Sequence, residues 1–213
     1  SSNRGLCGAF NSNAIKATIH RALTTFDSQM MARQVDFIVI GKKGSDFLRK
    51  KKYNVISDGS ALFDGLTFDG VAAIAEMIMK LFTEGEYDHV DIIYNSFKNA
   101  GTQILNIEQF LPIQIENLAH SSAGIPHVDY IFEPTKEYIV KELIPRSLKL
   151  QFYKAVLDSN AAEHAARMTA MHKATDNAAE LLKELNLQFN KARQASITNE
   201  ILEIVGGAEA LRG

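Results

Sequence analysis

Residues 146–205 contain neither proline nor glycine, and this uninterrupted stretch constrains the fold more than any other feature. A helix of that length would span roughly 90 Å at about 1.5 Å per residue. Small or apolar side chains recur in it at alternating spacings of four and three, which is typical of a coiled-coil seam. We define the seam as Leu157, Ala161, Met168, Met171, Ala178, Leu182, Leu185, Phe189 and Ala192, with His164, Thr175 and Ser196 as its imperfect members.

The part of the chain before Pro134 has a different period. Short apolar runs predict strands at residues 35–40, 53–56, 90–94, 102–110 and 128–132, and helical spacing predicts helices at 45–52 and 67–82. This alternation of strand and helix indicates parallel βαβ units. We therefore predict an α/β domain over residues 1–134, then a helical shaft over 135–213. Within the shaft we expect a short helix at 135–143 and the long helix at about 146–205, with Pro145 in its first turn.

A coiled-coil seam needs a partner, and residues 1–134 contain no helix of comparable length. The partner could be an amino-terminal segment cut from this chain, a second copy of the chain, or another protein. The first five residues lack an initiator methionine and resemble the loop that follows a strand, so we expect the chain to be cut at its start. From the pattern alone, the long helix is one half of a coiled coil whose other half is not found in residues 1–134.

Composition removes several classes of function. A net charge of -2, from 23 basic and 25 acidic side chains, gives no electrostatic reason to expect nucleic acid. The single cysteine, Cys7, cannot form an internal disulfide. No apolar run approaches the roughly 20 residues that a spanning helix needs. We therefore expect contact with a membrane only indirectly, through a partner.

The glycine-containing segments do not match a nucleotide-binding loop. Residues 5–8 lack the G-x-G-x-x-G order, and residues 41–45 lack the order of a P-loop. The histidines show no metal-ligand spacing, and no pair of carboxylates stands in a pocket context. We expect no catalytic residue, no metal and no cofactor.

Hydrogen-bonding side chains gather near the end of the long helix. Residues 190–201 hold Arg193, Gln194, Thr198, Asn199 and Glu200 within two to three turns. From spacing alone, an ordinary solvated face and a binding surface stay equally open. The segment that follows, residues 201–211, is largely apolar. An exposed apolar helix tip is unfavourable in a free monomer and indicates insertion into a surrounding sleeve.

Six sequence blocks resemble the gamma subunit of F-type ATP synthases, and together they span the whole chain. Residues 3–11, NRGLCGAFN, are similar to the family motif that follows its first strand, with Asn3 in place of aspartate and Ala9 in place of glycine. The other blocks are YIFEP at 130–134, AARMTAM at 165–171, ATDNA at 174–178, NKARQASITNE at 190–200 and IVGGA at 204–208.

This resemblance implies a Rossmann-like α/β domain with a mostly parallel sheet, followed by one long coiled-coil helix. It also implies that the amino-terminal helix, the antiparallel partner of the seam, and most of the first strand are missing here. The role implied is that of a non-catalytic central-stalk rotor. It would couple rotation of the c ring to conformational changes at the catalytic sites of the beta subunits. The partners would be the alpha, beta and epsilon subunits and the c ring, on the cytoplasmic face of a bacterial inner membrane or the equivalent organellar face.

The resemblance also assigns residues to contacts. It places Arg193, Gln194, Thr198 and Glu200 against the beta subunits, and Tyr130 and Glu133 at the foot, against the epsilon subunit and the c ring. The alternative function is a Rossmann-type nucleotide-binding enzyme with a helical dimerisation arm, suggested by Gly5, Gly8 and the βαβ pattern.

Two structural expectations follow from a missing strand and a missing helix. The strand at 35–40 should have an open edge. The long helix should either fray in dilute solution or pair antiparallel with a second copy of this chain.

Overall fold

The computed structural model describes residues 1–113, 133, 135–211 and 213. The described chain divides into two compact units, Ser1–Thr169 (the first unit) and Ala170–Gly213 (the second unit). The boundary between these compact units falls inside the last helix. The boundary predicted between residues 134 and 135 rests on a change of sequence pattern, and it stays a prediction.

A parallel βαβ element forms one side of the first unit. Strand β1 (Phe37–Val39) is followed by helix α3 (Lys42–Lys50) and by strand β2 (Val55–Asp58), and the two strands pair in parallel. Alternate residues of β1 are buried, and the Phe37 and Val39 side chains pack on Ala22 and Leu48. The predicted strand–helix–strand order is confirmed here, with β1 shorter than predicted, the helix starting earlier and β2 shifted by two residues.

Strands β3 (Val90–Asn99) and β4 (Thr102–Leu111) pair antiparallel, so the expectation of a mostly parallel sheet is wrong for this pair. Only Ala100 and Gly101 separate them, which is long enough for a hairpin and far too short for a parallel crossover. The strands were predicted at the right places. The predicted strand at 128–132 lies outside the described residues.

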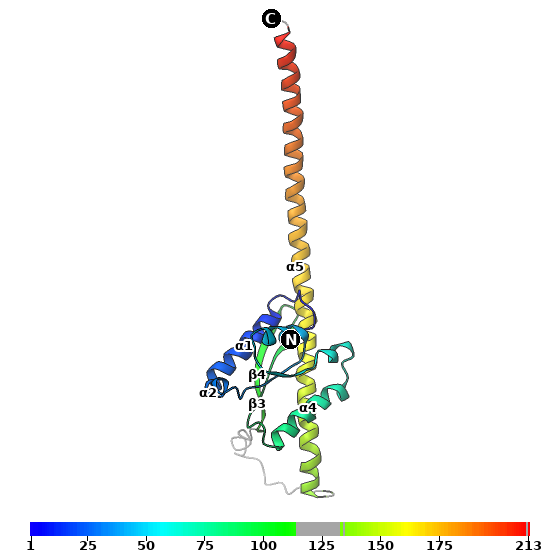
Figure 1. Cartoon of the computed structure of the whole chain (residues 1–213). Helices are drawn as coiled ribbons and strands as arrows, with labels where there is room; N and C mark the ends of the chain where they lie inside the picture. Colours follow the sequence, from blue (N-terminus) through cyan, green and yellow to red (C-terminus); the bar gives the residue numbers. More distant parts are fainter. Residues whose placement is uncertain (114–132, 134, 212) are drawn as a thin grey trace, which may run out of the picture. The chain divides into compact units, whose positions relative to one another are not determined.

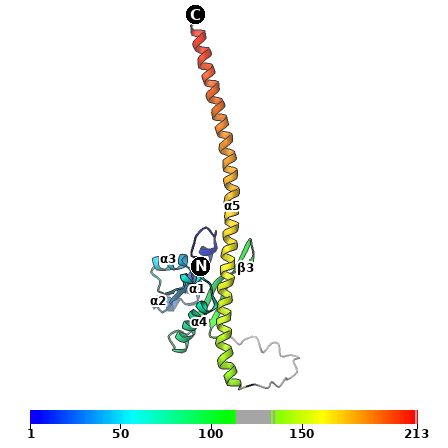
Figure 2. The same cartoon turned by 90° about the vertical axis from the view of Figure 1, so that its right-hand side faces the viewer.

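Two helices near the start of the chain had no prediction. Helix α1 (Phe10–Thr25) buries Phe10, Ala14 and Ala22, and a short helix α2 (Asp27–Met31) follows it. The buried face of α1 is built largely from small residues, so its apolar signal in the sequence is weak. Figure 2 shows α1 and α3 on the same side of the part of the last helix that belongs to this unit.

Helix α4 (Phe68–Thr83) begins and ends with recognisable signals. The Thr67 hydroxyl accepts a hydrogen bond from the Gly70 amide at 3.3 Å, which caps the amino terminus. At the other end Gly85 adopts a φ of 76°, and the Glu86 amide donates to the Leu81 carbonyl at 3.0 Å. This is a Schellman motif, in which glycine supplies the left-handed residue. The predicted helix at 67–82 is confirmed.

Helix α5 runs without interruption from Lys136 to Ala210, with Pro145 inside it. The predicted break between a short helix and a long helix at Pro145 is therefore wrong. Pro145 cannot donate a hydrogen bond to the Lys141 carbonyl, but that turn is exposed, so water can bond the carbonyl. Figure 1 shows the helix as a single ribbon coloured from green to red. It is one long helix, as predicted, but its 75 residues extend beyond both ends of the predicted 146–205.

The core of the first unit joins α5 to the α/β elements. Its largest cluster brings together side chains from α4, the end of β4 and α5: Val71, Ala75, Ile78, Phe110, Leu111, Leu148, Phe152 and Val156. The Phe110 and Phe152 rings lie 5.7 Å apart between centroids. A second cluster packs Ala162 and Ala166 of α5 against Cys7 and Phe10. Alanine lets the backbones of α5 and the loop approach closely at this point.

Candidate functional surface

Helix α5 presents two different faces along the first unit. Ala155, Ala162 and Ala166 are buried against the α/β elements, whereas Leu157 and Met168 of the seam are 41% and 50% exposed. The seam therefore lies on the face that the α/β elements do not cover. Within the described part of this unit, no helix is packed on it.

The seam is equally uncovered in the second unit. Leu182, Leu185 and Phe189 are 63%, 52% and 66% exposed, and the apolar tip at Ile201, Leu202 and Ile204 is similarly exposed. Single exposed apolar residues are common on protein surfaces, but a continuous apolar stripe marks an interaction surface. This exposed stripe is the most extensive candidate site in the described residues.

The four residues assigned to beta-subunit contact fall into two pairs on α5. At 3.6 residues per turn, Arg193 and Glu200 lie within about 20° of each other, and Gln194 and Thr198 within about 40°. The two pairs are separated by about 130° around the helix. All four side chains are exposed, and the Thr198 hydroxyl donates to the Gln194 carbonyl at 2.8 Å. The helix therefore does not gather them on one face.

An apolar stripe runs between these two pairs. Ile197, Ile201 and Ile204 lie at intermediate angles, about 20° to 80° from Arg193. Apolar side chains flanked on both sides by hydrogen-bonding groups match the composition of a protein–protein interface. Sequence reasoning identified the polar residues and the apolar tail separately, and helical geometry combines them into one surface.

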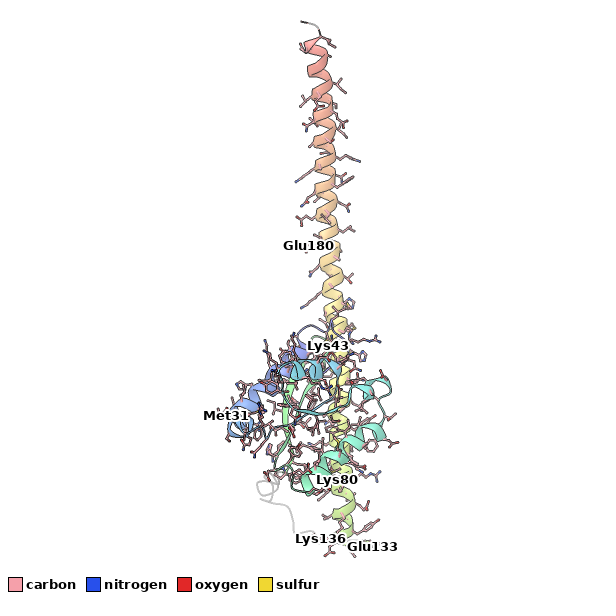
Figure 3. All side chains as sticks on the ribbon, in the orientation of Figure 1. Met31, Lys43, Lys80, Glu133, Lys136 and Glu180 are labelled. Atoms are coloured by element: carbon pink, nitrogen blue, oxygen red, sulfur yellow. The ribbon has the colours of Figure 1, made fainter. Side chains whose placement is uncertain are left out.

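Of the two residues assigned to the foot, the structure describes only Glu133. Tyr130 lies outside the described residues. Glu133 is exposed and precedes the start of α5. Figure 3 shows Glu133 beside Lys136 at that end of the helix, at the edge of the first unit.

The glycine loop at residues 41–44 is closed by the start of the chain, whereas the space beside Gly5 and Gly8 is open. The Ser1 amine donates to the Ile40 carbonyl at 2.9 Å, and the Lys43 amide donates to the Ser2 carbonyl at 3.0 Å. A Cβ atom on Gly41 would lie 2.0 Å from the Ser1 carbonyl oxygen, and one on Gly44 would lie 2.6 Å from its hydroxyl oxygen. These glycines are therefore needed for close approach of Ser1, and the space at which a phosphate would sit is filled.

The loop over residues 1–8 is tied to α5 by Arg167. The Arg167 guanidinium pairs with Glu163 at 2.6 Å and donates to the carbonyls of Gly5 at 3.4 Å and Arg4 at 3.5 Å. From the other side, the Asn11 amide donates to the Ser2 hydroxyl at 2.7 Å and to Cys7 Sγ at 3.2 Å. Cys7 is thus a buried packing residue. The sequence contains the signal for this ion pair, an arginine four residues after a glutamate in a helix.

A cavity of about 610 Å³ lies within the first unit, between the edges of β1 and β3. Charged groups gather at the end where both strands begin. Asp91 accepts from Arg21 Nε at 2.8 Å and contacts His89 Nε2 at 2.8 Å, and Tyr87 donates to Asp36. Nothing in the sequence spacing predicts the Arg21–Asp91 and Tyr87–Asp36 pairs, because their members lie far apart in the sequence.

The Tyr87–Asp36 pair makes the stability of the fold depend on pH. Burial raises the pKa of Tyr87 to about 12 from its ordinary 10.0, and the hydrogen bond to Asp36 and the charge of Asp36 raise it in the same direction. A raised pKa in the folded state stabilises the fold below the unfolded value, so that contribution is lost as pH rises from about 10 to about 12.

We expect the Tyr87→Phe variant to lose stability less steeply than the unmodified chain over this pH range. Denaturant midpoints measured across the range check the prediction, with exposed Tyr138→Phe as the matched control. Identical slopes for Tyr87→Phe and the unmodified chain would contradict it.

The described residues hold no group of three or more histidine, cysteine, aspartate or glutamate side chains placed to bind a metal. No helix in the described part of the chain combines the length and apolarity needed to cross a bilayer.

Known proteins match the chain over its full length. A family model described as ATP synthase matches residues 1–211. The ATP synthase gamma chain of Flavobacterium psychrophilum is 59% identical over 213 residues, which are 100% of this chain and 71% of that one. That of Cytophaga hutchinsonii is 53% identical over 210 residues, 99% of this chain and 71% of that one.

Solved structures agree in fold. The central stalk and c ring of the Tetrahymena thermophila mitochondrial ATP synthase contain a chain with 25% identity and a TM-score of 0.60, covering 82% of this chain and 73% of that one. A chain in the Euglena gracilis mitochondrial ATP synthase has 23% identity and a TM-score of 0.66, and the match covers 99% of this chain and 70% of that one. The predicted combination of an α/β unit and one long helix is confirmed. From the family model and the identities over the whole chain, this protein belongs to the ATP synthase gamma chain family.

Proposed function

We propose that this chain acts as a central-stalk rotor subunit of an F-type ATP synthase. In that role it couples rotation of a c ring to conformational changes at catalytic sites carried by beta subunits. The observation that carries the proposal is the long α5 helix, which is packed into an α/β unit over its first part and bears an uncovered apolar stripe. Membership of the gamma chain family supports it.

The packing of α5 suits the transmission of torque. Leu148, Phe152 and Val156 are buried in the core of the first unit, and Ala162 and Ala166 are buried against the loop over residues 1–8. Protein interiors are close-packed and have low compressibility, so a force on the α/β elements is passed to the helix with little deformation. On this proposal the chain itself performs no chemistry, and it acts by pressing on subunits that do.

The surface near the end of α5 is the proposed contact with the beta subunits. Arg193 and Glu200 on one side of the isoleucine stripe, and Gln194 and Thr198 on the other, would hydrogen-bond to beta-subunit loops. The isoleucines would lie in the apolar sleeve of the alpha and beta subunits.

At the opposite end of α5, Glu133 together with Tyr130 is the proposed foot, in contact with the epsilon subunit and the c ring. The amino-terminal helix of a whole gamma chain is the proposed partner of the seam. These contacts would hold the chain at the cytoplasmic face of a bacterial inner membrane, or the equivalent organellar face, without its entering the bilayer.

Removal of the epsilon subunit and c ring should leave the helix-end contacts with alpha and beta subunits intact.

A chimera tests the proposed function directly. The matching 71% of the Flavobacterium psychrophilum gamma chain is replaced by these 213 residues, and the product is mixed with alpha and beta subunits that lack a gamma subunit. We expect ATP hydrolysis to be restored to the level given by the unaltered relative. An inactive mixture, with the chimera folded by circular dichroism, would refute the rotor function.

The Arg193→Ala substitution in this chimera should weaken binding to the alpha and beta subunits by about tenfold or more. A hydrogen bond to a charged group contributes about 1.5–3 kcal/mol, and about 1.4 kcal/mol is tenfold in affinity. Asn199→Ala is the matched control, because Asn199 lies on the same turns of α5 but points away from both polar pairs. Binding is measured by titration of the labelled chimera. Equal affinities for the two variants would show that Arg193 is not part of the contact.

The alternative, a nucleotide-binding enzyme with a helical arm, finds no support in the family comparisons. The filled space beside Gly41 and Gly44 also argues against a phosphate site there. Isothermal titration with ATP, ADP and NAD separates the two functions, since stoichiometric binding to the isolated chain contradicts the rotor function.

A further inference from the structure

Three Asp-Gly pairs lie close together in the chain, at residues 58–59, 64–65 and 69–70, and the sequence has no other such pair. In an Asp-Gly pair the glycine amide nitrogen can attack the aspartate side-chain carboxyl group, because glycine has no side chain to shield its nitrogen. The backbone must open locally for this attack, since the amide has to leave its hydrogen bond and approach the carboxyl carbon. The fold therefore decides which of the three pairs can react.

The pair at residues 58–59 is held by hydrogen bonds and packing at the end of β2. The Gly59 amide donates to the Val39 carbonyl at 2.8 Å, and the Asp58 carboxylate accepts from the Ser60 amide at 3.0 Å. A Cβ atom on Gly59, which is buried, would lie 3.0 Å from the Ile74 side chain. Attack by this amide would break its bond to β1 in a place with little room for the backbone to move.

The pair at residues 69–70 lies in the first turn of α4. The Gly70 amide donates to the Thr67 hydroxyl at 3.3 Å, which is the amino-terminal cap of the helix. A Cβ atom on Gly70 would lie 3.0 Å from the Leu62 side chain. Closing a ring between the glycine nitrogen and the Asp69 carboxyl carbon requires the aspartate ψ angle to leave the helical range. This pair can react only when the start of α4 unwinds.

The pair at residues 64–65 has none of these restraints. The short 3₁₀ helix η1 (Ser60–Asp64) ends at this pair, and both Asp64 and Gly65 are exposed. Among the described residues, the Gly65 amide donates no hydrogen bond. A Cβ atom on Gly65 would meet no atom within 4 Å. Because a 3₁₀ turn has poorer hydrogen-bond geometry than an α-helix, its last residue opens readily.

We propose that Asp64 is a site of spontaneous modification, at which aspartate converts to isoaspartate while the other two Asp-Gly pairs persist. The Gly65 nitrogen bonds to the Asp64 side-chain carboxyl carbon, and the carboxyl hydroxyl leaves with the amide proton as water. Water then opens the cyclic imide at the main-chain carbonyl carbon. The chain afterwards continues through the side-chain carbon and is longer by one methylene group. Water is the only other reactant, and the proposal is independent of the rotor function.

The added methylene group lies between two side chains that pack on the core of the first unit. Leu62 and Leu66 stand on either side of the reacting pair, and both contact the cluster that joins α4, β4 and α5. Close-packed interiors respond to a change of one methylene group, so a longer connection between the two leucines disturbs their packing. Conversion at Asp64 should therefore lower the stability of the first unit.

Incubation of the folded 213-residue chain for days at physiological pH and temperature tests the proposal. Trypsin releases residues 53–80 as one peptide, because no lysine or arginine lies inside it, and this peptide contains all three pairs. Electron-transfer fragmentation identifies isoaspartate at each position. It should form at Asp64 at least about tenfold faster than at Asp58 or Asp69, which corresponds to about 1.4 kcal/mol in the free energy of local opening. In guanidinium chloride the three rates should become similar.

Gly65→Ala is the matched variant, because alanine shields the amide nitrogen and a Cβ atom at this position has room. The φ angle of Gly65 is -164°, which is extended backbone that any residue adopts. The variant should react several-fold more slowly at Asp64, with Asp58 and Asp69 unchanged. Its denaturant midpoint should stay constant during incubation, whereas that of the unmodified chain falls. Equal rates at the three positions in the folded chain would overturn the proposal, as would a preference for Asp64 that persists in guanidinium chloride.

Discussion

Replacing Phe152 by alanine is expected to lower the free energy of unfolding of the first unit by about 3–5 kcal/mol. Phe152 is 5% exposed and lies in the cluster that joins α4, β4 and α5, with its ring against that of Phe110. Truncation removes its buried apolar area and leaves a cavity that the surrounding helices and strands can fill only in part. Among single substitutions on α5, this one should have the largest effect on how the helix is held.

The control for this substitution is Leu150→Ala. Leu150 lies two residues away on the same helix and is 60% exposed, so its loss should change stability by about 0.5 kcal/mol or less. Urea unfolding followed by near-ultraviolet circular dichroism, which reports the aromatic packing, measures both variants. A Phe152→Ala variant as stable as Leu150→Ala would mean that α5 is not anchored by this cluster.

The uncovered seam is expected to make the isolated chain associate. Each of Leu182, Leu185 and Phe189 would gain about 1.5–3 kcal/mol from full burial. A single exposed helix lacks that gain and still bears an ordering cost of about 1–2 kcal/mol per residue. Because Ala162 and Ala166 are packed in the first unit, the helix should fray only beyond about residue 169 when the chain is dilute. At higher concentration it should pair with a second copy, in an antiparallel arrangement.

Sedimentation and circular dichroism over a concentration series check this expectation. Helical content and apparent mass should rise together, and the triple substitution of Leu182, Leu185 and Phe189 by serine should abolish the rise. Leu187→Ser is the control, because Leu187 is 57% exposed but points away from the seam. Addition of a peptide with the sequence of a relative's amino-terminal helix should displace self-association. A chain that is strictly monomeric and fully helical at micromolar concentration would refute the argument.

The elements that the sequence predicted correctly carry strong local signals. Helix α5 lacks internal glycine until Gly206, and α4 has both an apolar face and the stop signal at Gly85. Helix α1 depended on context that a local pattern does not contain. The predicted strands at 90–94 and 102–110 were separated by only seven residues, too few for a parallel crossover, so their spacing already implied the antiparallel pairing of β3 and β4. Helix α1 is held by tertiary contacts through Phe10, Ala14 and Ala22.

The candidate surface was predictable in its residues and less so in its arrangement. Arg193, Gln194, Thr198 and Glu200 were assigned by resemblance, and their contact with beta subunits stays a prediction. Their division into two pairs around Ile197 and Ile201 follows from helical geometry alone. The cavity and its acidic end could not be read from the sequence. They depend on how Asp36, from one segment, and Tyr87 and Asp91, from another, come together in space.

The bonds from Arg167 to the loop over residues 1–8 affect how that loop tolerates mutation. Arg167 reaches the backbone carbonyls of Arg4 and Gly5 and no side chain of the loop. Leu6 and Gly8 adopt positive φ angles of 64° and 57°, and the Leu6 side chain is 74% exposed. Chemical character at position 6 can therefore vary freely, whereas β-branched residues, which are strained in the left-handed region, should be excluded. Backbone geometry, more than side-chain chemistry, would therefore limit which substitutions the loop tolerates, even though the loop has polar and charged side chains on its surface.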